Sequence, residues 1–137
     1  MRKCLLFALL AVWGLHVTSC LVLGEGMDFR TGKEGGIPYM TGGISKGERA
    51  EMEKRSMDYN LKIILAAKSG AYLANIPVTI CDPAGKTVMS TRADGPWLYV
   101  RLPEGRYSIK AGHEGQEKEK TIQVDQGLEL VMFHWAT

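Results

Sequence analysis

The sequence predicts an all-β protein, an antiparallel Greek-key β-sandwich of about seven strands preceded by a short helix. From residue 60 onward, segments of alternating apolar and polar residues recur at short and regular intervals. Turn residues, mostly Gly beside Asp or Pro, separate these segments. The segments themselves are rich in aromatic and β-branched residues. A region of this length can bury one small core, so we expect a single domain over residues 60–137.

The first part of the chain, residues 1–20, is expected to be an export signal and not part of that domain. A basic start precedes an apolar stretch at 5–15, which has the length of a signal peptide and is too short for an ordinary membrane span. Residues 17–20 resemble a bacterial lipobox, so Cys20 is a candidate for lipidation and membrane attachment. Ordinary cleavage, for example after Gly24, and an uncleaved N-terminal anchor stay open as alternatives. We expect the protein in the bacterial periplasm or lipid-anchored to the cell envelope.

Residues 21–59 are predicted to be a glycine-rich linker that ends in a short helix at about 46–57. Glycines are frequent before the helix and no periodicity is sustained there. The apolar residues within 37–44 leave open that this part docks on the folded domain. Ser45 can cap the helix, and Glu48 three residues later completes a capping box. The apolar residues of the helix form no single stripe, so we expect it to be exposed and loosely packed.

The β region follows as seven strand-like segments with turn signals between them. Asp94-Gly95 and Pro103-Glu104-Gly105 are the clearest turns, and we expect a positive φ at both glycines. Side chains alternate in each segment as a half-buried strand requires. The predicted strands are 61–65, 76–81, 86–91, 97–101, 106–111, 118–124 and 128–133.

The most informative segment spans residues 94–111, where Gly-x-Trp-x-Tyr is followed by Leu-Pro-x-Gly-x-Tyr-x-Ile-x-Ala. This pattern resembles the central signature of the carboxypeptidase regulatory-like domains, small transthyretin-like β-sandwiches of many exported bacterial proteins. The resemblance covers roughly residues 61–124, and it implies that the aromatic and aliphatic signature residues face the core. The signature residues are Gly95, Trp97, Tyr99, Leu102, Pro103, Gly105, Tyr107 and Ile109.

Strand 97–101 is apolar on both faces, which predicts a covered outer surface. If Trp97 and Tyr99 face the core, Leu98 and Val100 point outward because side chains alternate along a strand. The last strand is also apolar on both sides. We therefore expect the apolar segment before the helix, the helix itself or a partner protein to cover part of the outer face. Exposed aromatics near strand ends could instead stack on a ligand. The candidate interaction residues are Leu98, Val100, Tyr72 and Trp135.

Motifs that would indicate catalysis are missing from the sequence. A zinc carboxypeptidase site needs a His and a Glu three residues apart, whereas Gln116 and Thr137 stand at that spacing after His113 and His134. The chain also lacks the Tyr-Arg-Gly-Ser ending of the transthyretin-like hydrolases, a nucleophile elbow, a P-loop and a dinucleotide fingerprint. Cys81 stands alone in a predicted strand and is expected to be a small buried residue. We expect no catalytic residue, metal or cofactor.

Charge gives little indication of a partner. The chain has 17 basic and 15 acidic residues, and two of the basic residues lie in the predicted signal, so the remainder is formally neutral. No basic stripe for nucleic acid remains. We expect a non-catalytic exported sandwich that acts as an interaction or stability module at the cell envelope, with another envelope protein as its partner. The alternatives are a carbohydrate- or peptide-binding module that uses exposed aromatics and, more remotely, an unrecognised hydrolase.

Overall fold

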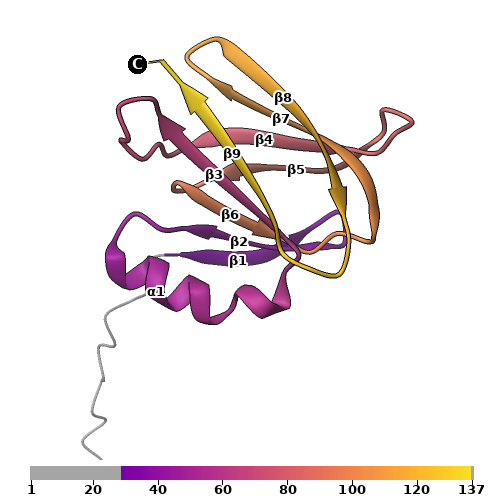
Figure 1. The fold of residues 1–137 in the computed structure, drawn as a ribbon, viewed down its shortest axis with the longest axis horizontal. Coiled ribbons are helices and arrows are strands. Elements are labelled where there is room, and N and C mark those ends of the chain that lie inside the picture. The colour runs from indigo at the N-terminus through magenta and orange to yellow at the C-terminus, as the bar shows by residue number, and fades with distance from the viewer. Residues whose placement is uncertain (1–28, 137) are drawn as a thin grey trace, which may run out of the picture.

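The computed structural model describes residues 29–136, and Figure 1 shows them as two facing β-sheets with a short helix at one side. The predicted all-β sandwich is confirmed, although the described residues form nine strands where about seven were expected. The predicted signal and Cys20 lie outside the described residues. The elements are β1 (Arg30–Glu34), β2 (Ile37–Gly42), α1 (Lys46–Lys54), the 3-10 helix η1 (Ser56–Asp58), β3 (Leu61–Ala67), β4 (Ile76–Cys81), β5 (Thr87–Ala93), β6 (Trp97–Val100), β7 (Gly105–His113), β8 (Gln116–Val124) and β9 (Glu129–Trp135).

The two sheets are antiparallel except for one pair of strands. Sheet A has the strand order β1-β2-β6-β3-β9, and sheet B has the order β5-β4-β7-β8. β9 lies parallel to β3, because the chain crosses over from β8 in sheet B and enters β9 beside the start of β3. The backbone N–H of Glu129 donates to the carbonyl of Asn60 at 2.9 Å and fixes this shared starting point.

The first two strands, β1 and β2, correct the prediction of a linker before the helix. They form a hairpin, and β2 also pairs with β6, so the hairpin is part of sheet A. Gly35 and Gly36 have φ angles of +58° and +81°, which a two-residue hairpin turn requires. Tyr39 packs in the core between the sheets, while Met40 packs on the opposite face of sheet A. The glycines within residues 32–43 therefore belong to turns and close contacts within the fold.

The main core fills the space between the two sheets, and the predicted orientation of β6 is wrong. Leu98 and Val100 are fully buried in this core, whereas Trp97 and Tyr99 lie on the outer face of sheet A. The register explains the orientation, because Leu98 pairs with a core residue of β3, Ile63. Since both faces of β6 are covered, both of its side-chain sets are apolar and alternation alone does not show which set faces inward.

The signature residues of β7 and of the loop between β6 and β7 lie as expected, whereas Gly95 is the exception described below. Leu102, Tyr107 and Ile109 are buried in the main core, and the Tyr107 hydroxyl donates to the carbonyl of Pro103 at 2.8 Å. Tyr107 and Ile109 do not lie beside Trp97, which is on the other side of sheet A. Gly105 has the expected positive φ, +155°.

Gly95 is required for a different reason from the predicted one. It is not among the described glycines with a positive φ. A Cβ at this position would instead lie 2.4 Å from the carbonyl oxygen of Gly42, which is backbone and has little freedom to move. The glycine therefore allows the turn before β6 to approach the end of β2 closely.

We predict that Gly95→Ala destabilises the fold by about 1–3 kcal/mol, because the added methyl group overlaps a backbone carbonyl. Gly127→Ala is the matched control, since a Cβ there meets no atom within 4 Å. We expect that control to change the free energy of unfolding by less than about 0.5 kcal/mol. Urea unfolding of both variants measures the difference, and equal midpoints would contradict the close approach of the two backbone segments.

Candidate interaction surface

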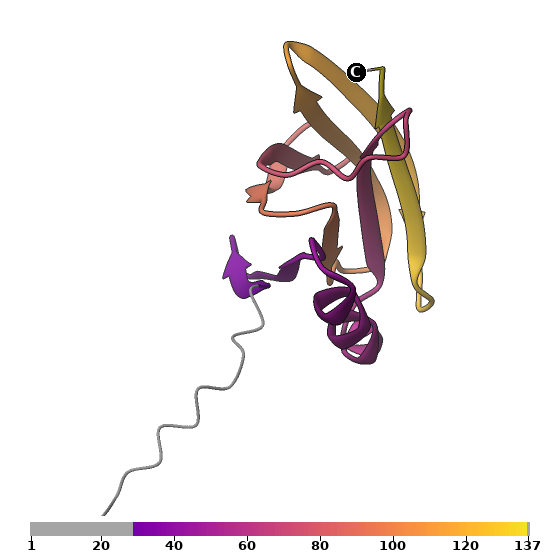
Figure 2. The same ribbon diagram turned by 90° about the vertical axis from the view of Figure 1, so that its left-hand side faces the viewer.

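Helix α1 packs on the outer face of sheet A, over β2 and β6 and on the side away from sheet B (Figure 2). Its Met52 is fully buried against Met40 of β2 and against Trp97 and Tyr99 of β6. The predicted cover of the outer face is therefore present, but the residues beneath it are the aromatics of β6. The expectation of a loosely packed helix is wrong, because one methionine anchors it without a continuous apolar stripe.

Local contacts hold α1 in this place. The predicted capping box is present, with the Ser45 hydroxyl accepting from the Glu48 backbone and the Glu48 carboxylate accepting from the Ser45 backbone. The Arg49 guanidinium donates to the carbonyls of Gly43 and Ile44 at 2.7 and 3.1 Å. It also lies 4.9 Å from the ring centre of Tyr72. The helix is thus tied to the loops at its N-terminal end.

Lys62 of β3 lies next to the covered aromatics on the same face. Its ammonium is 3.3 Å from the ring centre of Trp97 and 5.3 Å from that of Tyr99. Burial lowers the pKa of Lys62 and raises the pKa of Tyr99 to about 12, because both charged forms are poorly solvated there. The carboxylate of Glu53 on α1 acts on both groups, yet no ion pair among the described residues includes Lys62.

β9 forms the uncovered part of this face. Leu130 and Met132 are 56% and 37% exposed, whereas Phe133 and Trp135 on the opposite side of the strand are buried in the core. In the register of β3 and β9, Leu130 lies beside Lys62 and Met132 beside Ile64. An apolar row therefore continues from the aromatics under α1 to the edge of the sheet, where nothing among the described residues covers it.

The edge of β9 is closed although its outer face is open. Lys118 and Lys120 of β8 extend from sheet B and donate to the carbonyls of His134 and Met132. Lysines at an edge strand hinder the addition of another strand. A binding partner would therefore meet the side chains of β9 and not its backbone.

Exposed large hydrophobic residues gather around this one face of the sandwich. In the described part of the chain they flank α1, follow β3 or lie on and just before β9. They are Ile44, Met57, Tyr72, Leu128, Leu130 and Met132. The outer face of sheet B instead presents a polar row in which Thr79 pairs with Ser90 and Lys110, and Ser108 with Thr121. The two faces of the sandwich therefore differ in kind.

The structure separates the four candidate interaction residues. Leu98, Val100 and Trp135 are buried in the core, so they do not form a surface. The indole N–H of Trp135 donates to the carbonyl of Gln116 at 3.0 Å, which explains how a polar group is accommodated there. Tyr72 is 52% exposed as expected, but the Arg49 guanidinium lies over its ring. Of the four candidates, the structure therefore leaves one aromatic exposed, whereas a stacking platform would need several.

Sequence reasoning missed Lys62, Leu130 and Met132 as surface candidates. The alternation of 128–133 already separated Leu130 and Met132 from the core set of β9. What was missing was the knowledge that β9 lies at the edge beside Lys62, since strand order is not encoded in the alternation.

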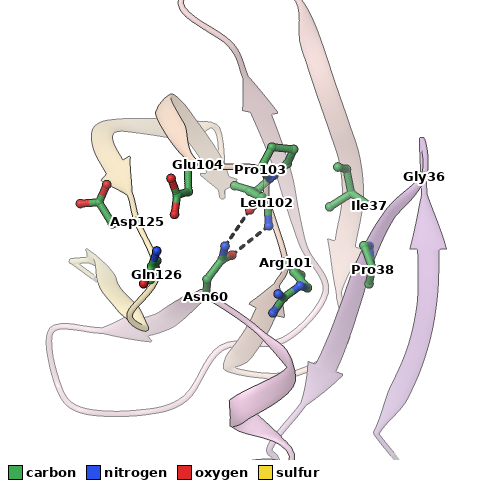
Figure 3. A pocket seen from close by; sticks show the side chains of 10 residues that line it. All are labelled: Gly36, Ile37, Pro38, Asn60, Arg101, Leu102, Pro103, Glu104, Asp125 and Gln126. Atoms are coloured by element: carbon green, nitrogen blue, oxygen red, sulfur yellow. Dashed lines mark hydrogen bonds between the residues drawn. The ribbon is translucent and has the colours of Figure 1, made fainter.

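A cleft of about 560 Å³ lies at the end of the sandwich between β2, β6 and the loop before β9 (Figure 3). Its most buried polar side chain, Asn60, donates to the carbonyl of Leu102 at 2.6 Å and accepts from the Leu102 N–H at 2.8 Å. The Asn60 amide is thereby used to hold the chain after β6. Glu104 and Asp125 lie on one side and Arg101 on the other, without the convergent polar groups of a catalytic site.

Two smaller clefts contain the other titratable candidates. In one, Cys81 is buried with its Sγ 3.8 Å from the Thr87 hydroxyl. In the other, His113 lies 3.8 Å from a carboxylate oxygen of Glu114 and edge-on to Trp135. Within residues 29–136, no group of His, Cys, Asp and Glu side chains is arranged to hold a metal ion.

Comparison with models of protein families finds no match for the chain, and comparison with curated proteins finds none either. Among the residues that the structure describes, neither helix has the length and apolar character needed to span a bilayer.

We predict that Met52→Ala destabilises the protein by about 2–5 kcal/mol, because it removes the buried contact between α1 and sheet A. Met57 is 90% exposed and offers a matched control, since Met57→Ala removes the same atoms from solvent-exposed surface. The control should stay within about 0.5 kcal/mol of the original protein in thermal or urea unfolding. Equal losses in both variants would refute the anchoring role of Met52.

We predict that stability falls as the pH rises from about 10 to about 12. Tyr99 has a pKa of about 12 in the folded protein against 10.0 for the unfolded chain, so the unfolded chain loses its proton first. The loss should approach about 2–3 kcal/mol. Tyr99→Phe should reduce this pH dependence, whereas Tyr72→Phe should retain it. Urea unfolding at several pH values measures the effect, and identical slopes for the two variants would contradict it.

Proposed function

We propose that the protein is an exported, non-catalytic β-sandwich that acts as an interaction module at the bacterial cell envelope. The observation that carries the proposal is the exposed apolar row of Leu130 and Met132 on a strand whose other side is buried in the core. An exposed apolar row beside the covered part of the same sheet is typical of a surface that another molecule contacts. The partner we propose is another envelope protein.

Export rests on the N-terminal residues. The basic start and apolar stretch within 1–20 have the order of an export signal, and Cys20 offers a site for lipid attachment. Phe29 is nine positions after Cys20, so a lipid at Cys20 would hold the sandwich within roughly 30 Å of the membrane. The carboxypeptidase regulatory-like resemblance agrees with this location, because such domains occur in many exported bacterial proteins.

A sugar-binding role has less support in the molecule. It would use Tyr72, whose ring is exposed but carries Arg49 over it, and Trp135, which is buried. Stacking on a sugar generally needs a free aromatic face, and a specific site adds convergent hydrogen-bonding groups. The apolar row on β9 is the larger free surface and fits a protein partner better.

We predict that a photo-crosslinking amino acid at Leu130 captures a partner in intact cells, and that the same group at Ser90 on sheet B does not. The full chain with its own N-terminus is used, and the cells are fractionated before the products are examined. Leu130→Ser without the crosslinker should retain the fold, because the side chain is exposed. Equal capture from both positions would argue against this face, and recovery in the cytoplasm with residues 1–20 intact would argue against export.

A further inference from the structure

The open part of the outer face of sheet A is formed by β9, and half-buried residues of β3 separate it from the cluster under α1. We propose that it docks an amphipathic helix of the partner protein, packed next to α1, with an acidic side chain that faces Lys62. This inference rests on the proposed function and adds the chemistry of the partner. Three observations support it: the exposed side chains of β9, the charge of Lys62, and the closed backbone edge of β9.

Helix α1 shows how this sheet accepts a helix. It lies over β2 and β6, where Met52 contacts Met40, Trp97 and Tyr99. Neighbouring strands are about 4.8 Å apart and a helix with its side chains is about 10 Å wide, so one helix covers two strands.

Next to α1, Lys62 and Ile64 of β3 are half-buried, and Ile64 packs against the cluster under α1. Leu130 and Met132 of β9 are exposed. A further helix laid beside α1 would cover these two side chains of β9 and reach Lys62.

The outward side chains of β3 and β9 beside α1 form an apolar row that contains one cation. Ile64 of β3 lies beside Met132 of β9. Two residues earlier on each strand, Lys62 lies beside Leu130. Apolar residues at helical spacing on a partner would contact this row, in the way that Met52 contacts the covered part of the sheet. Lys62 lies within the row, between the covered aromatics and Leu130.

The charge of Lys62 is uncompensated by close contact. Its ammonium lies on the rings of Trp97 and Tyr99, and no described carboxylate forms an ion pair with it. A carboxylate brought to this half-buried site would make a charge-assisted contact of the kind that is strong when water is excluded. The carboxylate of Glu53 on α1 acts on Lys62 through its charge, but it forms no ion pair with Lys62.

Two other occupants fit the face less well. A second copy of the chain would bring its own Lys62 and the neighbouring Lys118 and Lys120 against the same cations, and like charges oppose each other. A flat bilayer would contact α1 before it reached the side chains of β9, because the helix protrudes from the outer face of sheet A (Figure 2). Strand addition to β9 is hindered by Lys118 and Lys120, which already donate to its carbonyls.

The test uses the full chain with a photo-crosslinking amino acid at Met132 in intact cells, followed by sequencing of the crosslinked peptide. We expect a peptide from another protein with apolar residues three and four positions apart and an Asp or Glu on the same face. Lys62→Met preserves the apolar floor, and we expect it to reduce the crosslink yield by about 30-fold. Lys110→Met, on the outer face of sheet B, is the matched control and should leave the yield unchanged.

A charge exchange gives the second measurement. Lys62→Glu should abolish the crosslink, and replacing the partner's acidic residue by Lys should restore it. The melting temperature of each variant is measured first, and Lys62→Met serves alone if Lys62→Glu does not fold. A crosslink to a second copy of this chain or to lipid would overturn the inference, and so would a partner peptide that has no acidic residue. An unchanged crosslink yield in Lys62→Met would overturn it as well. Capture from Leu130 would still support the proposed function in those cases, whereas capture from neither position would remove both.

Discussion

The strand β6 is buried on both of its faces, and the rest of the structure depends on this constraint. All four of its residues are buried: Leu98 and Val100 join the core between the sheets, and Trp97 and Tyr99 join the cluster under α1. A strand in this position needs a neighbour on each edge and a layer on each face. β2 and β3 supply the edges, sheet B supplies one layer, and Met52 of α1 supplies the other.

The N-terminal hairpin and helix are therefore integral parts of the domain. Without β2, one edge of β6 would lose its hydrogen-bonding partner, and without α1 two large aromatic side chains would face water. Transfer of such side chains out of water contributes about 1.5–3 kcal/mol each, which is a large share of the stability of a small domain. Arg30 strengthens the attachment, because its guanidinium bonds to Asp94 in the loop before β6 at 2.7 Å.

The sequence predicted the β-sandwich, the seven later strands, the capping box and the burial of Tyr107 and Ile109, because each depends on local patterns. It did not predict β1 and β2, since their glycines resemble those of a linker until the turn at Gly35-Gly36 is known. The sequence also could not show which side chains of β6 face the core, because the strand is apolar on both sides. The exposed row on β9 depends on strand order, which arises from contacts between distant parts of the chain.

The cover on sheet A is partial, and that is what connects the fold to the proposed function. The cluster under α1 ends at Lys62, whose half-buried ammonium rests on Trp97 and Tyr99, and beyond it the side chains of β9 are exposed. Lysines from β8 close the backbone edge of this strand while leaving its outer side chains free. An open edge would invite any extended chain, because backbone hydrogen bonds carry little sequence information. In the proposed function, a closed edge beside an open apolar face with one cation would select a partner by side-chain shape and charge.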